Sequence, residues 1–584
     1  MHVVARQDPT DRGLGGRSST LTLRALPTSG PGALALATAL TLLLPTRARA
    51  AQPVEDALED ASAPEEDASA EAESEPTPPP APAPAPRPES TPPPASEPSA
   101  TGEAPAQPES AQAAEQDLED EGEDRDDAAA REDKPAASDG ATRPQAYADG
   151  FHFGSYGRVV VGGDATGRAP RDADIVARGS RMDESTYTEL ELRREDYWEK
   201  TGAYTRIVAT VAFAHPIFHY NADFDAKLAI RNLYLEERDL GVKGLGIWAG
   251  SRMYRGDDIY ALDFWPLDNL NTIGGGLSYD FKSKTSLRLH AGLNQPTNPF
   301  YRQFILRSPV HNQLGETEVA LLDRQKLVSS ARVSQMIGVG ESGGVKLVGY
   351  GELHWTPSGQ RELSDQIYED VPSDMGFVAG GEVSLFTGKR SGHLNLYGRY
   401  AGGLAAYGEW GAPSQLALDR TASGAHEWIV ALGGNYEAGP FGLLAGAYLR
   451  SFRNASPALD FDDVNEGIFL LRPQLWLTKK RWLGLALEGS YQAQQRGVSV
   501  ENEDGSYAPL RGSLVRVGLM PFISPAGEGS YTRPHIRLMY LLTSRDAGAR
   551  SLYPDDDVFA RRKLDHFIGL SAEWWFGSTS YFRN

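Results

Sequence analysis

The chain has 584 residues, a formal net charge of −22 and no cysteine, so a disulfide framework and thiolate chemistry are excluded. Residues 51–145 hold 26 acidic and 5 basic side chains, whereas residues 1–50 hold 2 acidic and 6 basic ones. The remainder therefore carries about −5, an ordinary value for a folded domain. No basic patch indicates binding to nucleic acid, and we expect no such partner.

Residues 1–50 are predicted to be a secretory signal peptide. The apolar run ALALATALTLLL (33–44) follows several arginines and is too short to span a bilayer as a helix. The sequence Ala-Arg-Ala at 48–50 fits a signal-peptidase site, and we expect cleavage after it. Because no later stretch suits a membrane helix, a membrane location requires a closed β-barrel.

Residues 51–147 are predicted to be an acidic, Pro- and Ala-rich disordered periplasmic linker. The segment repeats Ala, Pro, Glu and Ser, as in PTPPPAPAPAPRPES, and has few aromatic or branched apolar side chains. Such a composition cannot bury enough surface to offset the entropy of ordering. Alternatively, residues 51–147 could be a spacer that reaches a periplasmic partner or the cell wall, but no binding motif supports this more specific hypothesis.

Residues 148–584 are predicted to form an all-β domain. In TYTELELR (186–193), Tyr187 and Glu189 share one face of a strand, and Leu190 lies on the other. TRPHIRLMYLL (532–542) alternates in the same way between charged and apolar faces. A packed interior would not accept these charges, so the apolar faces are expected to point outward, toward lipid.

About eighteen segments show this alternation, an even number in the range of barrels with an aqueous lumen. They begin near residues 155, 186, 205, 226, 244, 272, 286, 328, 344, 374, 391, 425, 439, 466, 482, 512, 532 and 564. Short turns, such as 437–442, alternate with long polar stretches, such as 295–325 and 402–424. This asymmetry predicts a transmembrane antiparallel barrel in the outer membrane of a Gram-negative cell.

Several segments, in order along the barrel, resemble maltoporins, the sugar porins of outer membranes. They are FHFGSYGRVVVG, ESTYTELEL, WAGSRMYRGDDIYALDFWPLD (248–268), RVSQMIGVGESGGVKLVGYGE, LRPQLWLT, SYTRPHIRLMY and GLSAEWWF. The stretch 248–268 is the most specific match, because it is similar to the run that leads into the family's inward-folded third loop.

The resemblance implies a homotrimer of eighteen-stranded barrels, embedded among outer-membrane lipid and lipopolysaccharide. It also implies facilitated diffusion of maltodextrins or similar oligosaccharides along a row of aromatic side chains, with no cofactor. A pyranose ring has an apolar face that stacks on an aromatic ring and a rim of hydroxyls that form hydrogen bonds. Each contact must be weak enough to release the sugar.

Positions that match the family's aromatic row are expected to contact the sugar. They are Tyr156, Tyr187, Trp265, Tyr531 and Trp575, with Trp574 as the alternative to Trp575 by one residue. Matching polar positions are expected to exchange hydrogen bonds with sugar hydroxyls: Arg158, Glu189, Arg231, Asp258 and Asp263.

The chain also departs from the family pattern. The tryptophan that the family places on its second loop has no counterpart, although Phe224 or Tyr220 could serve. Another aromatic position falls near His393, and an expected arginine falls at Gly256, displaced to Arg255. These differences bear on the choice of sugar more than on the fold.

Other motifs give no enzyme or metal site. Residues 340–344 (GESGG) fit a nucleophile-elbow pattern but lack its strand-turn-helix context, so a tight turn is expected. His215 and His219 lack a third ligand at a suitable spacing, and the acidic clusters at 460–463 and 555–557 suit solvated loops. We expect no catalytic residues and no bound metal.

Two other functions remain open on the sequence. A similar barrel could conduct another solute or act with little selectivity. Alternatively, the chain could be a structural anchor that ties the outer membrane to the cell wall through residues 51–147.

Overall fold

The computed structural model describes residues 149–579, apart from 170, 181, 183–185, 215–226, 309–314, 341, 388–391, 414–418, 457–461 and 502–504. All described residues belong to one compact unit, 132–584. The predicted signal peptide and the whole predicted acidic linker lie outside them, as do His215, His219, Tyr220 and Phe224.

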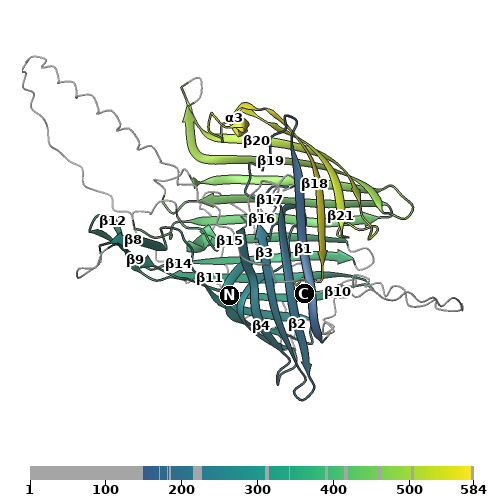
Figure 1. Cartoon of the computed structure of the whole chain (residues 1–584), viewed down its shortest axis with the longest axis horizontal. Coiled ribbons are helices and arrows are strands. Elements are labelled where there is room, and N and C mark those ends of the chain that lie inside the picture. Colours follow the sequence, from purple (N-terminus) through teal and green to yellow (C-terminus); the bar gives the residue numbers. More distant parts are fainter. Residues whose placement is uncertain are drawn as a thin grey trace, which may run out of the picture. The chain divides into compact units, whose positions relative to one another are not determined.

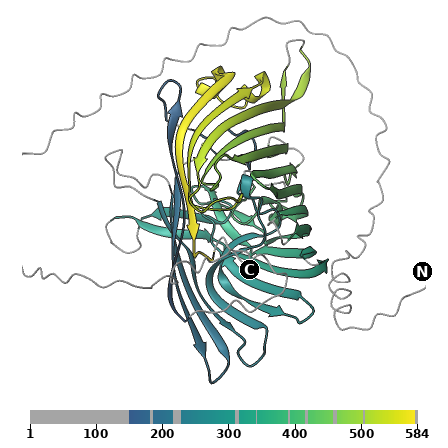
Figure 2. The same ribbon diagram turned by 90° about the vertical axis from the view of Figure 1, so that its right-hand side faces the viewer.

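The unit is a closed barrel of eighteen antiparallel strands (Figures 1 and 2). The strands are β1 (Gly150–Asp164), β2 (Tyr187–Trp198), β3 (Ala203–Ala214), β4 (Lys227–Arg238), β5 (Leu245–Arg255), β6 (Asn269–Asp280), β7 (Thr285–Asn294), β10 (Lys326–Val339), β11 (Gly343–Thr356), β14 (Asp374–Thr387), β15 (Gly392–Gly403), β16 (His426–Ala438), β17 (Phe441–Arg453), β18 (Val464–Trp476), β19 (Leu483–Glu501), β20 (Tyr507–Ile523), β21 (His535–Arg545) and β22 (Leu564–Phe576).

Each strand pairs with its neighbours in chain order, and β1 closes the ring by pairing with both β2 and β22. Each of the eighteen predicted segments corresponds to one of these strands, so the predicted all-β class and strand number are confirmed. Closure leaves no free sheet edge, which a lipid environment requires.

The barrel is apolar outside and polar inside. On β2, Leu190 and Leu192 are 40% and 53% exposed, whereas Glu189 and Glu191 are buried. On β21, Ile536 and Leu538 are exposed while the alternating polar residues are buried. The predicted outward direction of the apolar faces is confirmed.

Exposed aromatic side chains form a girdle near each end of the barrel. The end where β1 begins includes Phe151, Phe153, Tyr197, Trp198, Phe281, Tyr436, Phe441, Trp482 and Phe576. The opposite end includes Trp355, Phe377, Tyr400 and Trp428. Such belts mark the two membrane interfaces.

The two ends differ in their connections. Turns at the end where β1 begins are mostly short, and GESGG contributes one of them between β10 and β11, as predicted. The other end carries nine loops, numbered here in chain order, and the short-turn end is periplasmic in barrels of this kind. No helix in the described part of the chain is long and apolar enough to cross a membrane.

Two of the long loops contain secondary structure that their polar sequences did not indicate. The fourth loop contains a hairpin of β8 (Arg302–Arg307) and β9 (Thr317–Asp323), and the fifth contains β12 (Gly359–Ser364) and β13 (Ile367–Val371). Short helical turns are η2 (Tyr260–Leu262), η3 (Leu404–Tyr407), α2 (Ala547–Arg550) and α3 (Val558–Arg561).

Candidate functional site

A row of aromatic rings begins on neighbouring wall strands. In the β1–β2 and β1–β22 ladders, Tyr156 lies opposite Glu189 and Trp575, so the three side chains share the inner face. The ring centroids of Tyr156 and Tyr187 are 6.1 Å apart. Those of Tyr156 and Trp575 are 6.5 Å apart, with the planes only 16° from parallel.

The row continues through a residue of the third loop, 256–268. Tyr260, in η2, meets Trp575 edge-on with centroids 5.8 Å apart, and it meets Tyr531 at 5.5 Å. Tyr531 in turn stacks against His393 of β15 at 5.9 Å, with the planes 25° apart. Six rings thus form one connected series.

The series follows the barrel axis. Tyr187 begins β2 at the long-loop end, whereas Tyr531 lies in the turn between β20 and β21 and His393 stands near the start of β15, both at the short-turn end. A solute that moves from ring to ring would therefore advance along the barrel toward the short-turn end.

Polar groups flank the outer part of the row. The hydroxyl of Tyr187 donates to Glu189, and Arg231 donates to the same carboxylate at 3.0 Å. In the β3–β4 ladder, Val211 pairs with Ile230 and Thr210 with Asn232, so Arg231 is the extra residue of a β-bulge. A bulge redirects a side chain, and here it brings the guanidinium to Tyr187.

A buried carboxylate ties the middle of the row together. Glu573 accepts hydrogen bonds from Arg533 at 2.8 Å and Arg537 at 2.6 Å, and from the hydroxyl of Tyr260 at 3.0 Å. Arg533 also donates to that hydroxyl. The third loop is thereby attached to β22 across the lumen.

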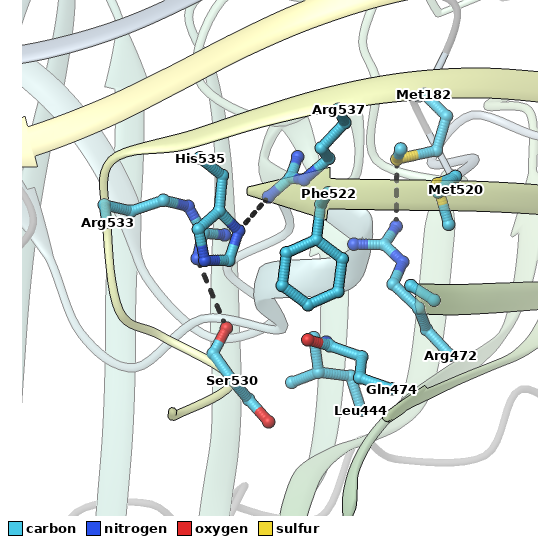
Figure 3. Close-up of a pocket in the computed structure, with 11 residues that line it drawn as sticks. Met182, Leu444, Arg472, Gln474, Met520, Phe522, Ser530, Arg533, His535 and Arg537 are labelled. Carbon is cyan, nitrogen blue, oxygen red and sulfur yellow. Dashed lines mark hydrogen bonds between the residues drawn. The ribbon is translucent and has the colours of Figure 1, made fainter. Parts of the chain in front are cut away.

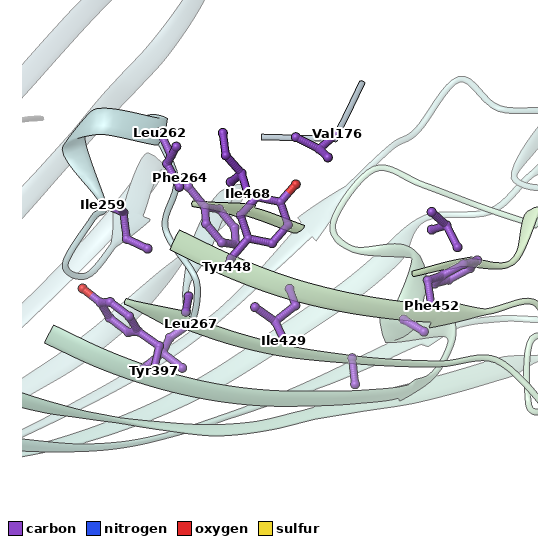
Figure 4. Close-up of a cluster of buried hydrophobic side chains, with 14 of the residues drawn as sticks. Val176, Ile259, Leu262, Phe264, Leu267, Tyr397, Ile429, Tyr448, Phe452 and Ile468 are labelled. Carbon is purple, nitrogen blue, oxygen red and sulfur yellow. The ribbon is translucent and has the colours of Figure 1, made fainter. Parts of the chain in front are cut away.

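The other face of the third loop packs on the barrel wall. Ile259, Leu262 and Phe264 join a buried apolar cluster with wall residues such as Ile429 and Tyr448 (Figure 4). Strand glycines make room for them. A Cβ at Gly433 would stand 2.9 Å from Ile259, and one at Gly446 would stand 3.1 Å from it.

Ion pairs hold the ends of the same loop. Arg332 of β10 pairs with Asp257 at 3.1 Å and with Asp268 at 2.8 Å, and Lys346 of β11 pairs with Asp257 at 2.5 Å. A Cβ at Gly256 would lie 1.9 Å from the Arg332 guanidinium. The arginine that the family resemblance places at Gly256 is therefore excluded, because Arg332 fills its space.

The described residues of the first loop, 165–186, contact the inner face of β17–β20. Asp174 pairs with Arg516 at 3.1 Å, and the backbone N–H of Ile175 donates to Gln492 at 2.9 Å. Between this loop, the wall strands and the turn 524–534 remains a cavity of about 10 Å³ (Figure 3). That is room for one water and not for a sugar ring. The aromatic row is therefore the candidate site.

The structure brings together most of the residues expected from the sequence. Tyr156, Tyr187, Tyr531 and Trp575 lie in the row, and His393 stands at its end. The polar expectations Arg158, Glu189 and Arg231 line the same face, because Arg158 lies opposite Tyr187 and Glu573. Their contact with sugar stays a prediction.

The remaining expected residues are not among the six rings or the polar groups described above. Trp265 has Arg255 over its ring at 4.0 Å and, within the described residues, makes no ring contact with the row. Asp258 and Asp263 lie on the third loop, both partly buried, with Asp263 at the end of η2 in a left-handed conformation (φ 47°). Trp574 lies opposite Gly157 on the other face of β22 from Trp575, so it faces outward, and its ring occupies the space a Cβ at Gly157 would take.

Sequence reasoning missed Tyr260, Arg533 and Glu573 as members of this site. Arg533 falls within the alternating segment 532–542, and its link to Glu573 crosses from a turn to β22. Tyr260 lies within the third-loop stretch, but no periodicity in a loop predicts which side chain faces the row.

A closed eighteen-stranded barrel with an apolar exterior, two aromatic girdles and a polar lumen is an outer-membrane porin. A family model described as LamB porin matches residues 151–576. The chain belongs to the LamB porin family.

A search of solved structures gave matches at low identity. OccK2 (OpdF) of Pseudomonas aeruginosa in complex with glucuronate is 12% identical, over 74% of this chain and 99% of that one, with a TM-score of 0.36. OmpT of Vibrio cholerae, in a trimer form, is 12% identical, over 73% and 100%, with a TM-score of 0.31. The search of curated proteins gave no match.

Residues that could bind a metal do not gather in the described part of the chain, where no group of three or more His, Asp or Glu side chains forms a site. Of the acidic clusters, Asp463 pairs with Arg453 and Asp557 pairs with Arg171. Both carboxylates thus take part in ion pairs, Asp463 with a residue of β17 and Asp557 with a residue of the first loop.

Proposed function

We propose that this porin is selective for carbohydrates and passes maltodextrins or similar oligosaccharides by facilitated diffusion along the aromatic row. The observation that carries the proposal is the connected series of rings from Tyr187 to His393, which follows the barrel axis. Linear oligosaccharides repeat an apolar ring face at regular intervals, and a series of aromatic rings offers repeated stacking surfaces.

The polar groups suit the hydroxyl rims of the same sugars. Arg158 and Arg231 are partly exposed on the row's face, whereas Glu189 and Glu573 are buried and hold neighbouring side chains in place. Charged groups form stronger hydrogen bonds than neutral ones and can exchange partners as a sugar advances. We propose that Arg158, Arg231, Asp258 and Asp263 supply these exchanges.

We further propose that the working unit is a homotrimer, as the maltoporin resemblance implies. Cross-linking of the protein in native membranes, followed by electrophoresis without heating, would show three linked copies. A single band at the monomer mass would contradict the trimer and leave the channel proposal intact.

The test of the transport proposal is ion current through the purified protein in a planar bilayer, titrated with maltose through maltoheptaose. We expect block that strengthens with chain length until the sugar spans the row. A conducting channel that no maltodextrin blocks would overturn the maltodextrin proposal, and titration with other glycans would then test carbohydrate selectivity itself.

A further inference from the structure

Lysine side chains gather at one end of the barrel. Ten of the described residues are lysines, and six of them stand in turns at the end where β1 begins. These six, called the lysine rim below, are Lys200, Lys243, Lys282, Lys284, Lys479 and Lys480. The other four lie at the long-loop end or within the lumen.

The lysine rim is exposed and largely free of acidic partners. Among the described residues, Lys243 pairs with Asp239 at 3.1 Å, and the other five form no ion pair. Of the carboxylates at this end, Glu199 directly precedes Lys200, and Glu528, in the turn 524–534, pairs with Arg481. The positive charge of the rim therefore rests mainly on Lys282, Lys284, Lys479 and Lys480, which form no ion pair among the described residues.

Apolar side chains stand directly beside these lysines. Trp198 is 53% exposed next to the turn of Lys200, and Phe281 precedes Lys282. Leu477 and Trp482 flank the turn that holds Lys479 and Lys480, and both are exposed. In an outer-membrane barrel, such residues lie where the hydrocarbon meets the headgroups.

Lysines at this depth can lay their alkyl stems along the apolar surface and extend their ammonium groups to the phosphates. A solute in the periplasm would approach the lysine rim only from the periplasmic side, whereas lipid headgroups surround the rim laterally. A headgroup of net negative charge is attracted by every lysine. A zwitterionic headgroup carries an ammonium that the rim repels.

From this placement we infer that the lysine rim is a binding surface for anionic phospholipid, of the phosphatidylglycerol class, in the periplasmic leaflet. At the other end, the long loops expose carboxylates such as Asp365, Asp555 and Asp556 beside their cations, so we expect the preference in one leaflet. This inference does not depend on which solute the channel conducts.

The test is quenching of tryptophan fluorescence by brominated phosphatidylglycerol, compared with brominated phosphatidylcholine, in vesicles that hold the full chain. Trp198 and Trp482 lie beside the rim and report on lipid there. We expect the native protein to prefer phosphatidylglycerol, and added salt to weaken the preference. The variant Lys282→Gln/Lys284→Gln/Lys479→Gln/Lys480→Gln should lose most of it, by roughly tenfold in relative affinity.

A matched control removes four charges at the other end: Arg168→Gln/Lys227→Gln/Arg561→Gln/Lys563→Gln, all exposed positions. This control should keep the preference. The inference is overturned if the native protein shows no preference, if the rim variant keeps it, or if the control loses as much. The two double variants, Lys282→Gln/Lys284→Gln and Lys479→Gln/Lys480→Gln, should each lose part of the preference for phosphatidylglycerol. They keep the inference testable if the fourfold variant does not fold.

Discussion

The guanidinium of Arg533 lies over the ring of Trp575, with its central carbon 4.1 Å from the ring centroid. One face of this indole is therefore occupied by a cation, which leaves at most the other face for the proposed stacking of a sugar. Since Arg533 also bonds Glu573 and Tyr260, one side chain orients two rings of the row.

Arg533→Met should keep apolar contact with Trp575 but leave Glu573 with fewer cationic partners. Removing one member of a buried ion pair costs about 3 kcal/mol, so we expect a loss of that order in the free energy of unfolding. Denaturant titration would measure it. Arg171→Met, at an exposed pair, should change the value by less than about 1 kcal/mol. Equal effects at both sites would contradict the buried-pair account.

Tyr260→Ala should interrupt the row, because Tyr260 is the ring that links Trp575 to Tyr531. An aromatic contact contributes about 1 kcal/mol, so block by maltohexaose should weaken roughly fivefold. Maltose, which spans fewer rings, should be affected less. Tyr260→Phe keeps the ring and should keep most of the block. Unchanged block in Tyr260→Ala would remove this residue from the path.

Trp575→Ala and Trp574→Ala form a matched pair on adjacent positions of β22. Trp575 faces the row and Trp574 faces outward, so only Trp575→Ala should weaken sugar block. Trp574→Ala should instead alter how the barrel sits in the bilayer. Single-channel recording with maltohexaose distinguishes the two. A larger effect at Trp574 would mean that the strand register is shifted by one residue.

Gly433→Val should push the third loop off the wall, because even a Cβ there comes within 2.9 Å of Ile259. The loop can yield only toward the aromatic row, so single-channel conductance should fall. Gly349→Val is the control, since a Cβ at Gly349 meets nothing within 4 Å. A conductance that stays the same in both variants would show that the third loop does not determine the width of the channel.

The outer loops offer a pH test. The Arg171 guanidinium, with the backbone N–H of Phe559, lowers the pKa of Asp557 below its usual range. A lowered carboxyl pKa stabilises the folded state above the ordinary aspartate pKa, about 4, and the effect is lost as pH falls through the folded value. Hydrogen exchange in α3 should therefore rise only on strong acidification. Asp557→Asn should remove this step and Asp555→Asn should not.

Sequence alternation was sufficient to predict the barrel because each lipid-facing strand must alternate for its whole length. Every strand start was predicted within a few residues, and the wall positions Tyr156, Tyr187 and Trp575 followed from parity and family register. The hairpins of the fourth and fifth loops were missed, since their polar sequences carry no lipid-facing pattern.

Contacts between loop and wall were beyond sequence reasoning for a different reason. The place of Tyr260 depends on Glu573, more than three hundred residues away in the chain, and on the space left by Gly433 and Gly446. No local pattern encodes such a fit. Gly256 is a second example. Only the structure shows that Arg332, from β10, occupies the space that a side chain at Gly256 would need.

The six rings come from three differently supported parts of the molecule: wall strands, an inward loop and a periplasmic turn. An oligosaccharide long enough to touch Tyr187, Tyr260 and Tyr531 at once would join these parts as a temporary cross-brace. Occupancy by long sugars should then raise the melting temperature of the barrel, while short sugars leave it unchanged. While it is bound, the oligosaccharide would therefore stabilise the channel that transports it.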